Sequence, residues 1–327
     1  MLPKKLQKKL EQRQQQNAFR NLSAPNMLVD FVSNDYLGFS KSKTISERTA
    51  ELLSEFKLQL NGSGGSRLLS GNHALYSALE QQLKLTHDAE AALVYNSGYT
   101  ANLGLISCLA QRGDIILFDE LCHASIRDAI SASYAKTYKF GHNNLFELNK
   151  LLEKHSAERD YEIYIITESV FSMDGDSPDL IKMIPLAHQF NAGLIIDEAH
   201  AVGVFENGLV QNLELQHQVF ARIVTFGKAL GNHGAAILGP SMLIDFLINF
   251  SRPFIYTTAL PPHTIATAIA AYEQLASHDA QSQLGSVIAH FKKMLDQFQL
   301  KDIFISSNSA IQSALIPGNN IVFTLLF

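Results

Sequence analysis

The sequence is poor in residues that cross-link a chain or anchor it in a membrane: it has no tryptophan, two cysteines and no long apolar run among its 327 residues. Cys108 and Cys122 lie in apolar or loop surroundings, which argues against a disulfide framework and a regularly spaced zinc site. Because no run reaches the roughly 18 apolar residues that span a bilayer, no membrane segment is predicted. The basic, glutamine-rich N-terminus also lacks the apolar stretch of a signal peptide. These absences predict a cytoplasmic protein with no membrane partner.

Charge and length narrow the class of protein further. A formal net charge of -5 argues against a dedicated nucleic-acid binder. A chain of this length with 46% hydrophobic residues can bury a large core. We predict an N-terminal helix and arm over residues 1–40, a large domain over 41–275 and the beginning of a C-terminal small domain over 276–327. The apolar segment 321–327 has no predicted element to pair with, so we expect this small domain to be incomplete.

Short apolar strands alternate with helices through most of the chain. A basic helix over 2–20, with leucines on one stripe, precedes a short strand and turn over 31–38. The main strands are predicted at 91–95, 114–118, 136–140, 161–166, 192–196 and 223–226. Beyond residue 240 we predict helices over 242–250 and 262–277, and then a new helix and strand from 281. Strands separated by helices in this way predict an α/β fold with a mainly parallel sheet flanked by helices.

Polar residues collect where these strands end. In parallel sheets ligands bind at the carboxyl ends of the strands, so the residues that follow each strand are expected to form one site. The residues in these positions are Ser97, His123, Ser172, Asp197, His200, Thr225 and Lys228.

Lys228 lies in a glycine-rich loop that leaves the strand 223–226. Its neighbours are small or apolar, so burial would destabilise its ammonium form and make the amine available as a nucleophile. A single lysine in such a place is more often a side chain whose amine reaches solvent. The neighbouring strand-end residues favour the functional interpretation for Lys228.

Together these residues suit pyridoxal phosphate. Its aldehyde requires a lysine for a Schiff base, and its ring nitrogen requires an anionic partner such as Asp197. Ser97, Gly98 and Tyr99 lie at a predicted helix N-terminus, where N–H groups favour a phosphate. The remaining candidates are His123, which could stack on the ring, and Ser172 and His200, which could hold the ring hydroxyl.

Eight stretches give the sequence a family resemblance. It resembles the α-oxoamine synthases, which are pyridoxal phosphate enzymes of fold type I that condense an amino acid with an acyl thioester and release carbon dioxide. The matching stretches follow the family's order over nearly the whole chain. They are 33–38 (SNDYLG), 62–67 (GSGGSR), 96–99 (NSGY), 123–126 (HASI), 168–176 (ESVFSMDGD), 197–200 (DEAH), 225–231 (TFGKALG) and 256–262 (YTTALPP).

The resemblance implies a role for each candidate residue. Lys228 would form the Schiff base and move the proton at the substrate α-carbon, and His123 would stack on the ring as a second catalytic residue. The other cofactor contacts implied are Ser97, Gly98, Tyr99 and Thr225 at the phosphate, Asp197 at the pyridinium, and Ser172 and His200 at the hydroxyl. Asn34 and Arg20 would bind the substrates, at the amino-acid carboxylate and at the far carboxylate of the acyl group respectively.

Within the family, the sequence is most similar to the branch that joins L-alanine to a pimeloyl thioester of coenzyme A or acyl carrier protein in biotin biosynthesis. The residues that indicate this branch are the segments 225–228 and 173–176 and the position of Arg20. Two alternatives stay open: a glycine-using synthase of the 2-amino-3-oxobutyrate or 5-aminolevulinate type, and an inactive pyridoxal phosphate-binding remnant. The resemblance also implies a homodimer with active sites at its interface. Family members continue beyond the point where this chain stops and carry a substrate-binding arginine there, so a C-terminally truncated small domain is expected.

Other interpretations of these motifs fail on their own requirements. Residues 197–200 spell the DEAH box of an ATPase motor, which needs a phosphate-binding P-loop that this sequence lacks. Asp174-Gly-Asp176 lacks the ligand periodicity of a calcium loop and favours a turn. No metal site is predicted.

Overall fold

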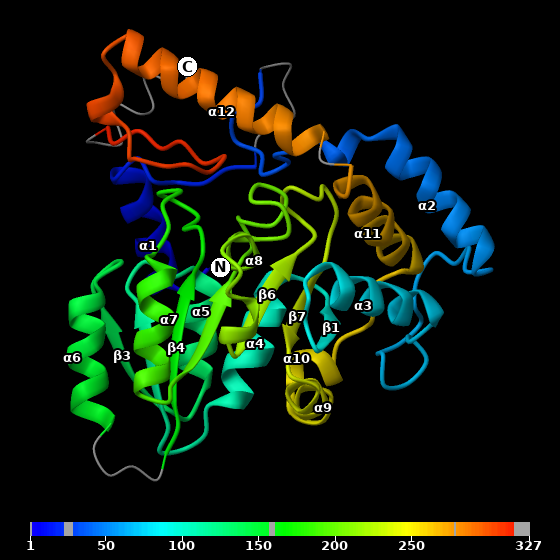
Figure 1. Ribbon diagram of the computed structural model, residues 1–327, viewed down its shortest axis with the longest axis horizontal. Coiled ribbons are helices and arrows are strands. Elements are labelled where there is room, and N and C mark those ends of the chain that lie inside the picture. Colours follow the sequence, from blue (N-terminus) through cyan, green and yellow to red (C-terminus); the bar gives the residue numbers. More distant parts are fainter. Residues whose placement is uncertain (1, 23–28, 157–160, 278, 317–327) are drawn as a thin grey trace.

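The computed structural model describes residues 2–22, 29–156, 161–277 and 279–316. Its centre is a seven-stranded sheet with the strand order β1-β7-β6-β5-β4-β2-β3 (Figure 1). The strands are β1 (Ala91–Tyr95), β2 (Ile115–Asp119), β3 (Lys136–Phe140), β4 (Ile163–Glu168), β5 (Gly193–Asp197), β6 (Ala221–Thr225) and β7 (Ala235–Gly239).

Six of the seven strands run in one direction, which confirms the predicted mainly parallel α/β sheet. The neighbouring strands β3, β2, β4, β5 and β6 pair in parallel, whereas β7 pairs antiparallel with both β6 and β1, so β1 runs in the same direction as β6. The six main strands predicted from the sequence are present within about two residues. β7 was missed because it is a five-residue apolar run next to a glycine-rich loop. The short strand predicted within 31–38 is wrong, since this segment forms bends and turns.

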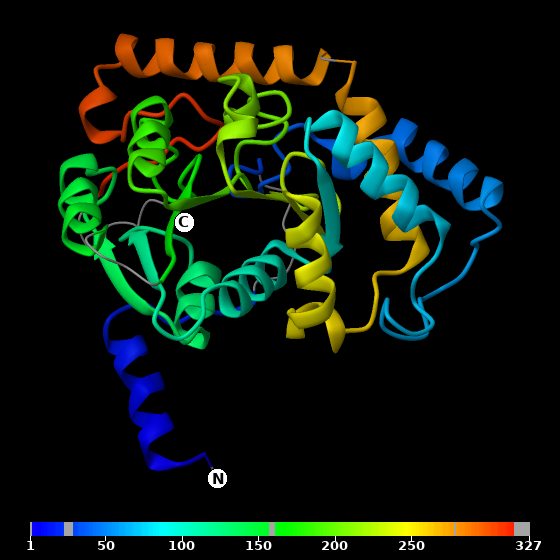
Figure 2. The ribbon, with the colours of Figure 1, turned by 60° about the horizontal axis from the view of Figure 1, so that its bottom comes forward.

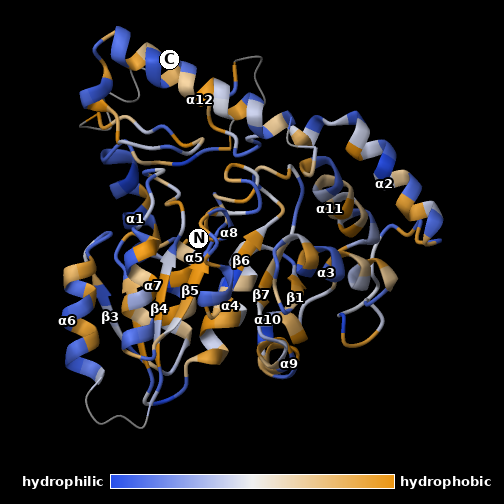
Figure 3. Ribbon diagram, viewed as in Figure 1, coloured by the Kyte–Doolittle hydropathy of each residue, from blue (hydrophilic) through white to orange (hydrophobic). Residues whose placement is uncertain are grey.

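Helices cover both faces of the sheet (Figure 3). Successive side chains along each strand point to opposite faces. In β5, Leu194 and Ile196 pack on one face, whereas Ile195 packs on the other. The first face is covered by α6 (Leu145–Ser156), α7 (Leu180–Gln189) and α8 (Leu209–Asn212). The second is covered by α4 (Gly98–Leu109), α5 (Ala124–Ala132), α9 (Ser241–Phe250) and α10 (Arg252–Ile255).

A third apolar cluster lies at the β1 end of the sheet. There α11 packs against both α2 and α3, and α3 packs against β1. The helices are α2 (Lys43–Glu55), α3 (Ala74–Thr86) and α11 (Pro262–Leu275), the last of which confirms the helix predicted from residue 262. Short 3-10 helices are η1 (Phe39–Lys41), η2 (Gln216–Gln218) and η3 (Lys301–Ile303).

The two end segments lie outside these layers. α1 (Lys4–Gln15) projects away from the body, and Leu2, Leu6 and Leu10 are each 45% exposed (Figure 2). α12 (Asp279–Gln297) confirms the helix predicted from residue 281, but the strand expected after it is reduced to one bridge between Phe304 and Ala314.

Two expectations about the chain as a whole are not tested by the structure. The apolar segment 321–327 lies outside the described residues, and the division at residues 40 and 275 stays a prediction. Among the described residues, no helix is both long and apolar enough to cross a bilayer.

Candidate active site

The site is built where three neighbouring parallel strands end. Glu168, Asp197 and Thr225 are the last residues of β4, β5 and β6. In each strand the residue two positions earlier packs in the cluster under α4 and α5, so these three side chains point to the same face. The sheet therefore brings two carboxyl groups and one hydroxyl to one edge, below the starts of α4 and α5.

A pocket with an empty volume of about 610 Å³ opens at this edge. It unites eight of the residues predicted from the sequence, namely Ser97, Gly98, Tyr99, His123, Asp197, His200, Thr225 and Lys228. Ser172 does not line it; this residue lines a neighbouring pocket, which shares His123 with the first. The prediction that the strand-end residues form one site therefore describes most of the set.

The two predicted substrate-binding residues lie outside the pocket lining. Arg20 is exposed on the segment after α1. Asn34 is also exposed, and its Oδ1 accepts a hydrogen bond of 3.1 Å from the hydroxyl of Tyr36. That hydroxyl lies 2.7 Å from Nδ1 of His200, which does line the pocket. Tyr36 therefore links Asn34 to the pocket residue His200 through hydrogen bonds. The substrate-binding roles of Asn34 and Arg20 remain predictions.

Asp197 forms the floor of the pocket and is 5% exposed. Its Oδ2 accepts from Nδ2 of Asn102 at 2.6 Å, and its Oδ1 accepts from the main-chain N–H of Ala199 at 2.9 Å. Burial raises the pKa of Asp197, and these two bonds oppose that rise. Both donors are neutral, so no cation is hydrogen-bonded to the carboxylate, and the group suits a cationic ring nitrogen.

The basic groups of the pocket are shifted in the opposite direction. Burial lowers the pKa of Lys228, although the charges of Asp197 and Glu168 partly offset this. Burial, together with the charges of Lys228 and His123, lowers the pKa of His200 to about 3. At neutral pH the His200 ring is therefore uncharged, and the Lys228 amine is a better nucleophile than an exposed lysine would be.

The N-terminus of α4 forms the opposite wall. The Ser97 side chain accepts a hydrogen bond from the main-chain N–H of Thr100, and the Thr100 hydroxyl accepts one from the main-chain N–H of Ser97. The N–H groups of Gly98 and Tyr99, in the first turn, have no partner within the helix. A Cβ at Gly98 would lie 2.7 Å from Cγ2 of Thr225, so only glycine allows this close approach. Main-chain N–H groups, a helix dipole and the hydroxyls of Ser97 and Thr225 together suit a phosphate.

His123 begins α5 and is held by its own helix. Its Nδ1 accepts from the main-chain N–H of Ser125 at 3.2 Å and lies 2.8 Å from the Ser125 hydroxyl. The hydroxyl in turn accepts from Asn102 at 3.1 Å, and Asn102 also holds Asp197. This network fixes the imidazole at the pocket wall, as a ring-stacking residue requires.

Sequence reasoning missed three residues of this network: Asn102, Ser125 and Glu168. Ser125 and Glu168 lie within the stretches 123–126 and 168–176 that carried the family resemblance. Asn102 lies about one turn after Ser97 on the same helix. The signals were thus present, but only the sheet order places these three side chains beside Asp197.

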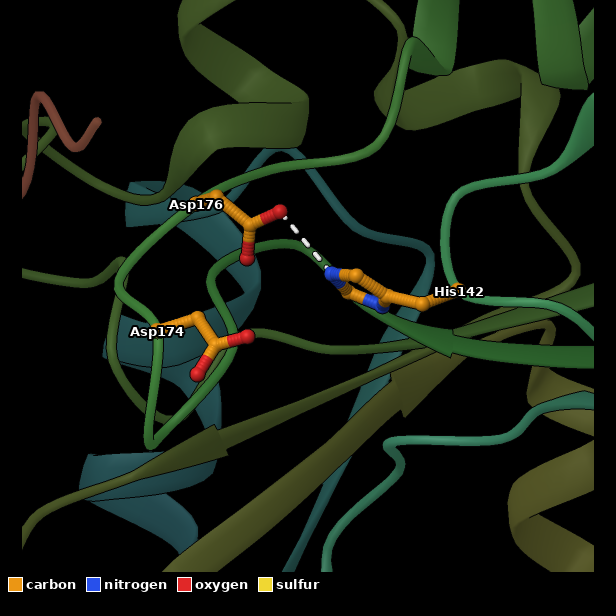
Figure 4. Close-up of side chains that lie close together, drawn as sticks. All are labelled: His142, Asp174 and Asp176. Carbon is orange, nitrogen blue, oxygen red and sulfur yellow. Dashed lines mark hydrogen bonds and ion pairs between the residues drawn. The ribbon is translucent and has the colours of Figure 1, made fainter. Parts of the chain in front are cut away.

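A second cluster of acidic and histidine side chains lies outside this pocket (Figure 4). Possible ligand atoms of His142, Asp174 and Asp176 lie within 4.8 Å of one another. However, Nδ1 of His142 is 3.0 Å from Asp119 and its Nε2 is 2.9 Å from Asp176, so both ring nitrogens are already bonded to carboxylates. We interpret this cluster as an ion-paired histidine that ties loops together, because both nitrogens that could bind a metal ion are engaged.

The residues present fit pyridoxal phosphate. Asp197 is a buried carboxylate that is hydrogen-bonded to neutral donors, Lys228 has a lowered pKa, and the N-terminus of α4 lines the pocket beside the hydroxyls of Ser97 and Thr225. These three features suit the three binding groups of this cofactor, which are the ring nitrogen, the aldehyde and the phosphate respectively.

Comparison with known proteins agrees with this cofactor. The chain belongs to the aminotransferase class I and II family, whose model matches residues 26–320. It shares the pyridoxal phosphate-dependent fold type I and this cofactor with that family, which confirms the expected fold class and the resemblance to the α-oxoamine synthases.

Particular relatives are similar over most of this chain. An 8-amino-7-oxononanoate synthase of Emericella nidulans is 39% identical over 316 residues, which cover 91% of this chain and 77% of the relative. A putative 8-amino-7-oxononanoate synthase of Halalkalibacterium halodurans is 41% identical over 249 residues, covering 75% and 62%. The match therefore spans between about three fifths and three quarters of the length of these relatives.

A solved structure is similar as well. A variant of serine palmitoyltransferase from S. paucimobilis, with bound PLP-myriocin aldimine, superposes with a TM-score of 0.86 at 25% identity. The superposition covers 97% of this chain and 86% of that one. The likeness includes almost every element described above.

Proposed function

We propose that this protein is an α-oxoamine synthase that condenses L-alanine with a pimeloyl thioester to give 8-amino-7-oxononanoate. The observation that carries the proposal is the meeting of Lys228, Asp197 and the α4 N-terminus in one pocket. The names of the relatives at 39% and 41% identity support this choice of substrates.

The proposed reaction exchanges two bonds at the alanine α-carbon. A carbon–carbon bond forms between this atom and the acyl carbon of the thioester, and the thiol leaves. The bond from the α-carbon to its carboxyl group breaks and releases carbon dioxide. Pyridoxal phosphate, when bound, supplies an electron-accepting pyridinium ring that stabilises negative charge at the α-carbon.

In this proposal Lys228 both holds the cofactor and moves the proton. Its amine lies in the loop after β6, where burial lowers its pKa and raises the fraction that is neutral at physiological pH. A neutral amine can attack an aldehyde and can later accept a proton from the α-carbon at its Nζ.

Asp197 and His123 orient the reacting group without entering the bond exchange. Asp197 would keep the ring nitrogen protonated, and Asn102 and Ala199 hold its carboxylate in place. His123 would cover one face of the ring, with its Nδ1 held by Ser125. By covering this face, His123 would shield the ring from water, which favours condensation over hydrolysis.

A different amino acid or acyl group is the main alternative. The superposition with serine palmitoyltransferase supports a serine-using synthase. Glycine differs from alanine by one methyl group, which changes binding by about 1–3 kcal/mol. The higher identity to the curated relatives favours alanine and a pimeloyl thioester.

Borohydride trapping tests the cofactor chemistry first. Reduction of the protein with pyridoxal phosphate, followed by peptide mass spectrometry, should place a stable cofactor adduct on Lys228. Lys228→Ala should lose the adduct and lower turnover by about 10³-fold or more. Lys182→Ala, at an exposed lysine of α7, should keep the adduct and serves as the matched control.

Substrate assays then separate the alternatives. Carbon dioxide release should require both L-alanine and pimeloyl thioester, and mass spectrometry should detect 8-amino-7-oxononanoate. Higher kcat/KM with glycine, or with serine and palmitoyl thioester, would replace the proposed substrates. A Lys228 adduct without turnover on any pair would leave only a cofactor-binding protein.

We also propose that the protein forms a homodimer. The support is a leucine stripe formed by Leu2, just before α1, and by Leu6 and Leu10 within it. Each leucine is 45% exposed, and α1 has no buried residues. An amphipathic helix of this kind usually packs its apolar stripe against another surface. Light scattering should give twice the chain mass, and a monomer at micromolar concentration would contradict the proposal.

A further inference from the structure

Glu168 and Asp197 form a pair of buried carboxyl groups at the floor of the pocket. They occupy paired positions on the parallel strands β4 and β5, and both side chains point to the face covered by α4 and α5. Glu168 is 3% exposed and Asp197 is 5% exposed. Both line the pocket, and the proposed chemistry so far uses only Asp197.

The Glu168 carboxyl group ties together two loops of the site. Its Oε1 accepts a hydrogen bond of 2.6 Å from the main-chain N–H of His123. The main-chain N–H of Ser172 also contributes a hydrogen bond to this carboxyl group. The first loop carries the imidazole at the pocket wall, and the second carries the serine of the neighbouring pocket. One side chain therefore sets the position of both.

Two adjacent carboxyl groups in a dry site do not both stay ionised. Burial and the nearby charge of Asp197 raise the pKa of Glu168 to about 8, against the two main-chain hydrogen bonds. Burial also raises the pKa of Asp197, but Asn102, Ala199, His123 and Lys228 all favour its charged form. At neutral pH the negative charge therefore belongs on Asp197, and Glu168 is protonated.

Other titratable groups face the pair from the neighbouring elements. Asp119, at the end of β2, also disfavours ionisation of Glu168. Cys122 lies before α5, and its own pKa is raised by burial and by the three nearby carboxyl groups, so it stays a neutral thiol. Lys228 contributes an amine, and its ammonium form is favoured by both members of the pair.

We propose that Glu168 is a positioning residue, a neutral carboxylic acid that anchors the main chain of His123 and leaves Asp197 as the single negative charge at the pocket floor. The proposal rests on the proposed function only for the identity of the cofactor. Ionisation of Glu168 in alkaline solution places a second charge beside Asp197 and favours the ammonium form of Lys228, which weakens attack on the aldehyde.

Cofactor binding as a function of pH tests this role. The dissociation constant for pyridoxal phosphate, measured by absorbance between pH 6 and pH 9, is compared for the wild type, Glu168→Gln and Glu168→Ala. Glutamine keeps an oxygen that can accept from His123 but cannot ionise. At pH 7 we expect the glutamine variant to bind about tenfold more tightly than the alanine variant, since the latter loses a buried hydrogen-bond partner.

The alkaline range gives the decisive readout. The wild type should lose affinity as the pH rises through about 8, and Glu168→Gln should lose less over the same range. Glu120→Gln, at a carboxyl group in the loop after β2 that does not line the pocket, is the matched control and should follow the wild-type profile. Circular dichroism establishes that each variant is folded.

Two results would overturn the proposal. Equal affinities of the glutamine and alanine variants at pH 7 would remove the anchoring role. A Glu168→Gln profile identical to the wild type would assign the alkaline change to Lys228 or the cofactor itself. Because the readout is binding, these outcomes are independent of whether the alanine and pimeloyl thioester assay succeeds.

Discussion

Two clusters of histidine and carboxyl side chains lie near the carboxyl-terminal edge of the same sheet. They differ in whether the carboxyl groups are hydrogen-bonded to a histidine or to neutral donors. Around His142, the imidazole bridges Asp119 and Asp176. In the pocket, Asp197 and Glu168 accept hydrogen bonds from neutral donors.

The pKa directions reflect this difference. In the pocket the pKa values of the acids are raised and those of the bases lowered, mainly by burial. For His142, burial opposes protonation, but the hydrogen bonds and charges of Asp119 and Asp176 outweigh it and raise the pKa. A cluster whose carboxyl groups have no hydrogen-bonded cation is prepared for a ligand, whereas a cluster whose carboxylates are bonded to a histidine stabilises the fold.

The largest expected effect comes from Asp197→Asn. Loss of the negative charge removes the partner of the ring nitrogen, so turnover should fall by about 10²-fold or more. Cofactor-free protein should become more stable, because the raised folded-state pKa means that ionised Asp197 destabilises the fold once the pH exceeds this value.

Calorimetry at pH 8 without cofactor measures this gain in stability, and a steady-state assay measures the loss of activity. Asp245→Asn, at an exposed aspartate of α9, is the control and should change neither. A cofactor-free Asp197→Asn protein that melts below the wild type would mean that Asp197 is a structural group like Asp176.

Asp176→Asn should destabilise the protein and leave cofactor binding almost unchanged, the opposite of the effects expected for Asp197→Asn. It weakens the charged partner of His142 Nε2, so the free energy of unfolding should fall by about 1–3 kcal/mol. Affinity for pyridoxal phosphate should change little, since Asp176 does not line the pocket. Asp174→Asn, in the same loop but not bonded to His142 in Figure 4, is the matched control.

Chemical denaturation gives the stability of both aspartate variants. Should Asp174→Asn and Asp176→Asn lose the same stability, the ion pair with His142 is not what holds this loop. The loop also supports the end of the described chain, because Gly175 O accepts a hydrogen bond of 2.7 Å from the hydroxyl of Ser307. Proteolysis near residue 307 should therefore accelerate in Asp176→Asn.

The smallest effect is the pH dependence that His142 confers. Because its pKa is raised in the folded state, its contribution is fully present below pH 6.5 and is lost as the pH rises through the folded-state value. Melting temperatures should therefore decline less between pH 6 and pH 9 in His142→Gln than in the wild type. His290→Gln, at an exposed histidine of α12, should keep the wild-type slope, and equal slopes in all three proteins would exclude His142 as the source.

Local sequence patterns predicted most of the architecture. Short apolar runs such as 91–95 and 192–196 became strands because burial on a sheet removes many apolar side chains from water at once. The segment 31–38 failed as a strand since two of its apolar residues, Phe31 and Val32, find no buried face and remain 87% and 89% exposed.

The residues of the candidate site also include some that the sequence located correctly and some that it did not. Residues that lie directly after a strand, such as Asp197, were identified because chain position alone places them at the carboxyl edge. Ser172 was grouped with them, yet the loop after β4 carries it to a neighbouring pocket. Its position depends on the hydrogen bonds of that loop, and sequence spacing does not determine these.

The sequence by itself determined six of the seven strands, the mainly parallel α/β class and the residue types that the cofactor needs, because these follow from apolar periodicity and from chemistry within a few neighbours. Tertiary structure decided the order of the strands, which makes Glu168 and Asp197 neighbours and separates them from His142. The pKa of each group depends on burial and on charges from distant parts of the chain. Only the folded protein therefore distinguishes a carboxyl group that awaits a ligand from one that is already paired.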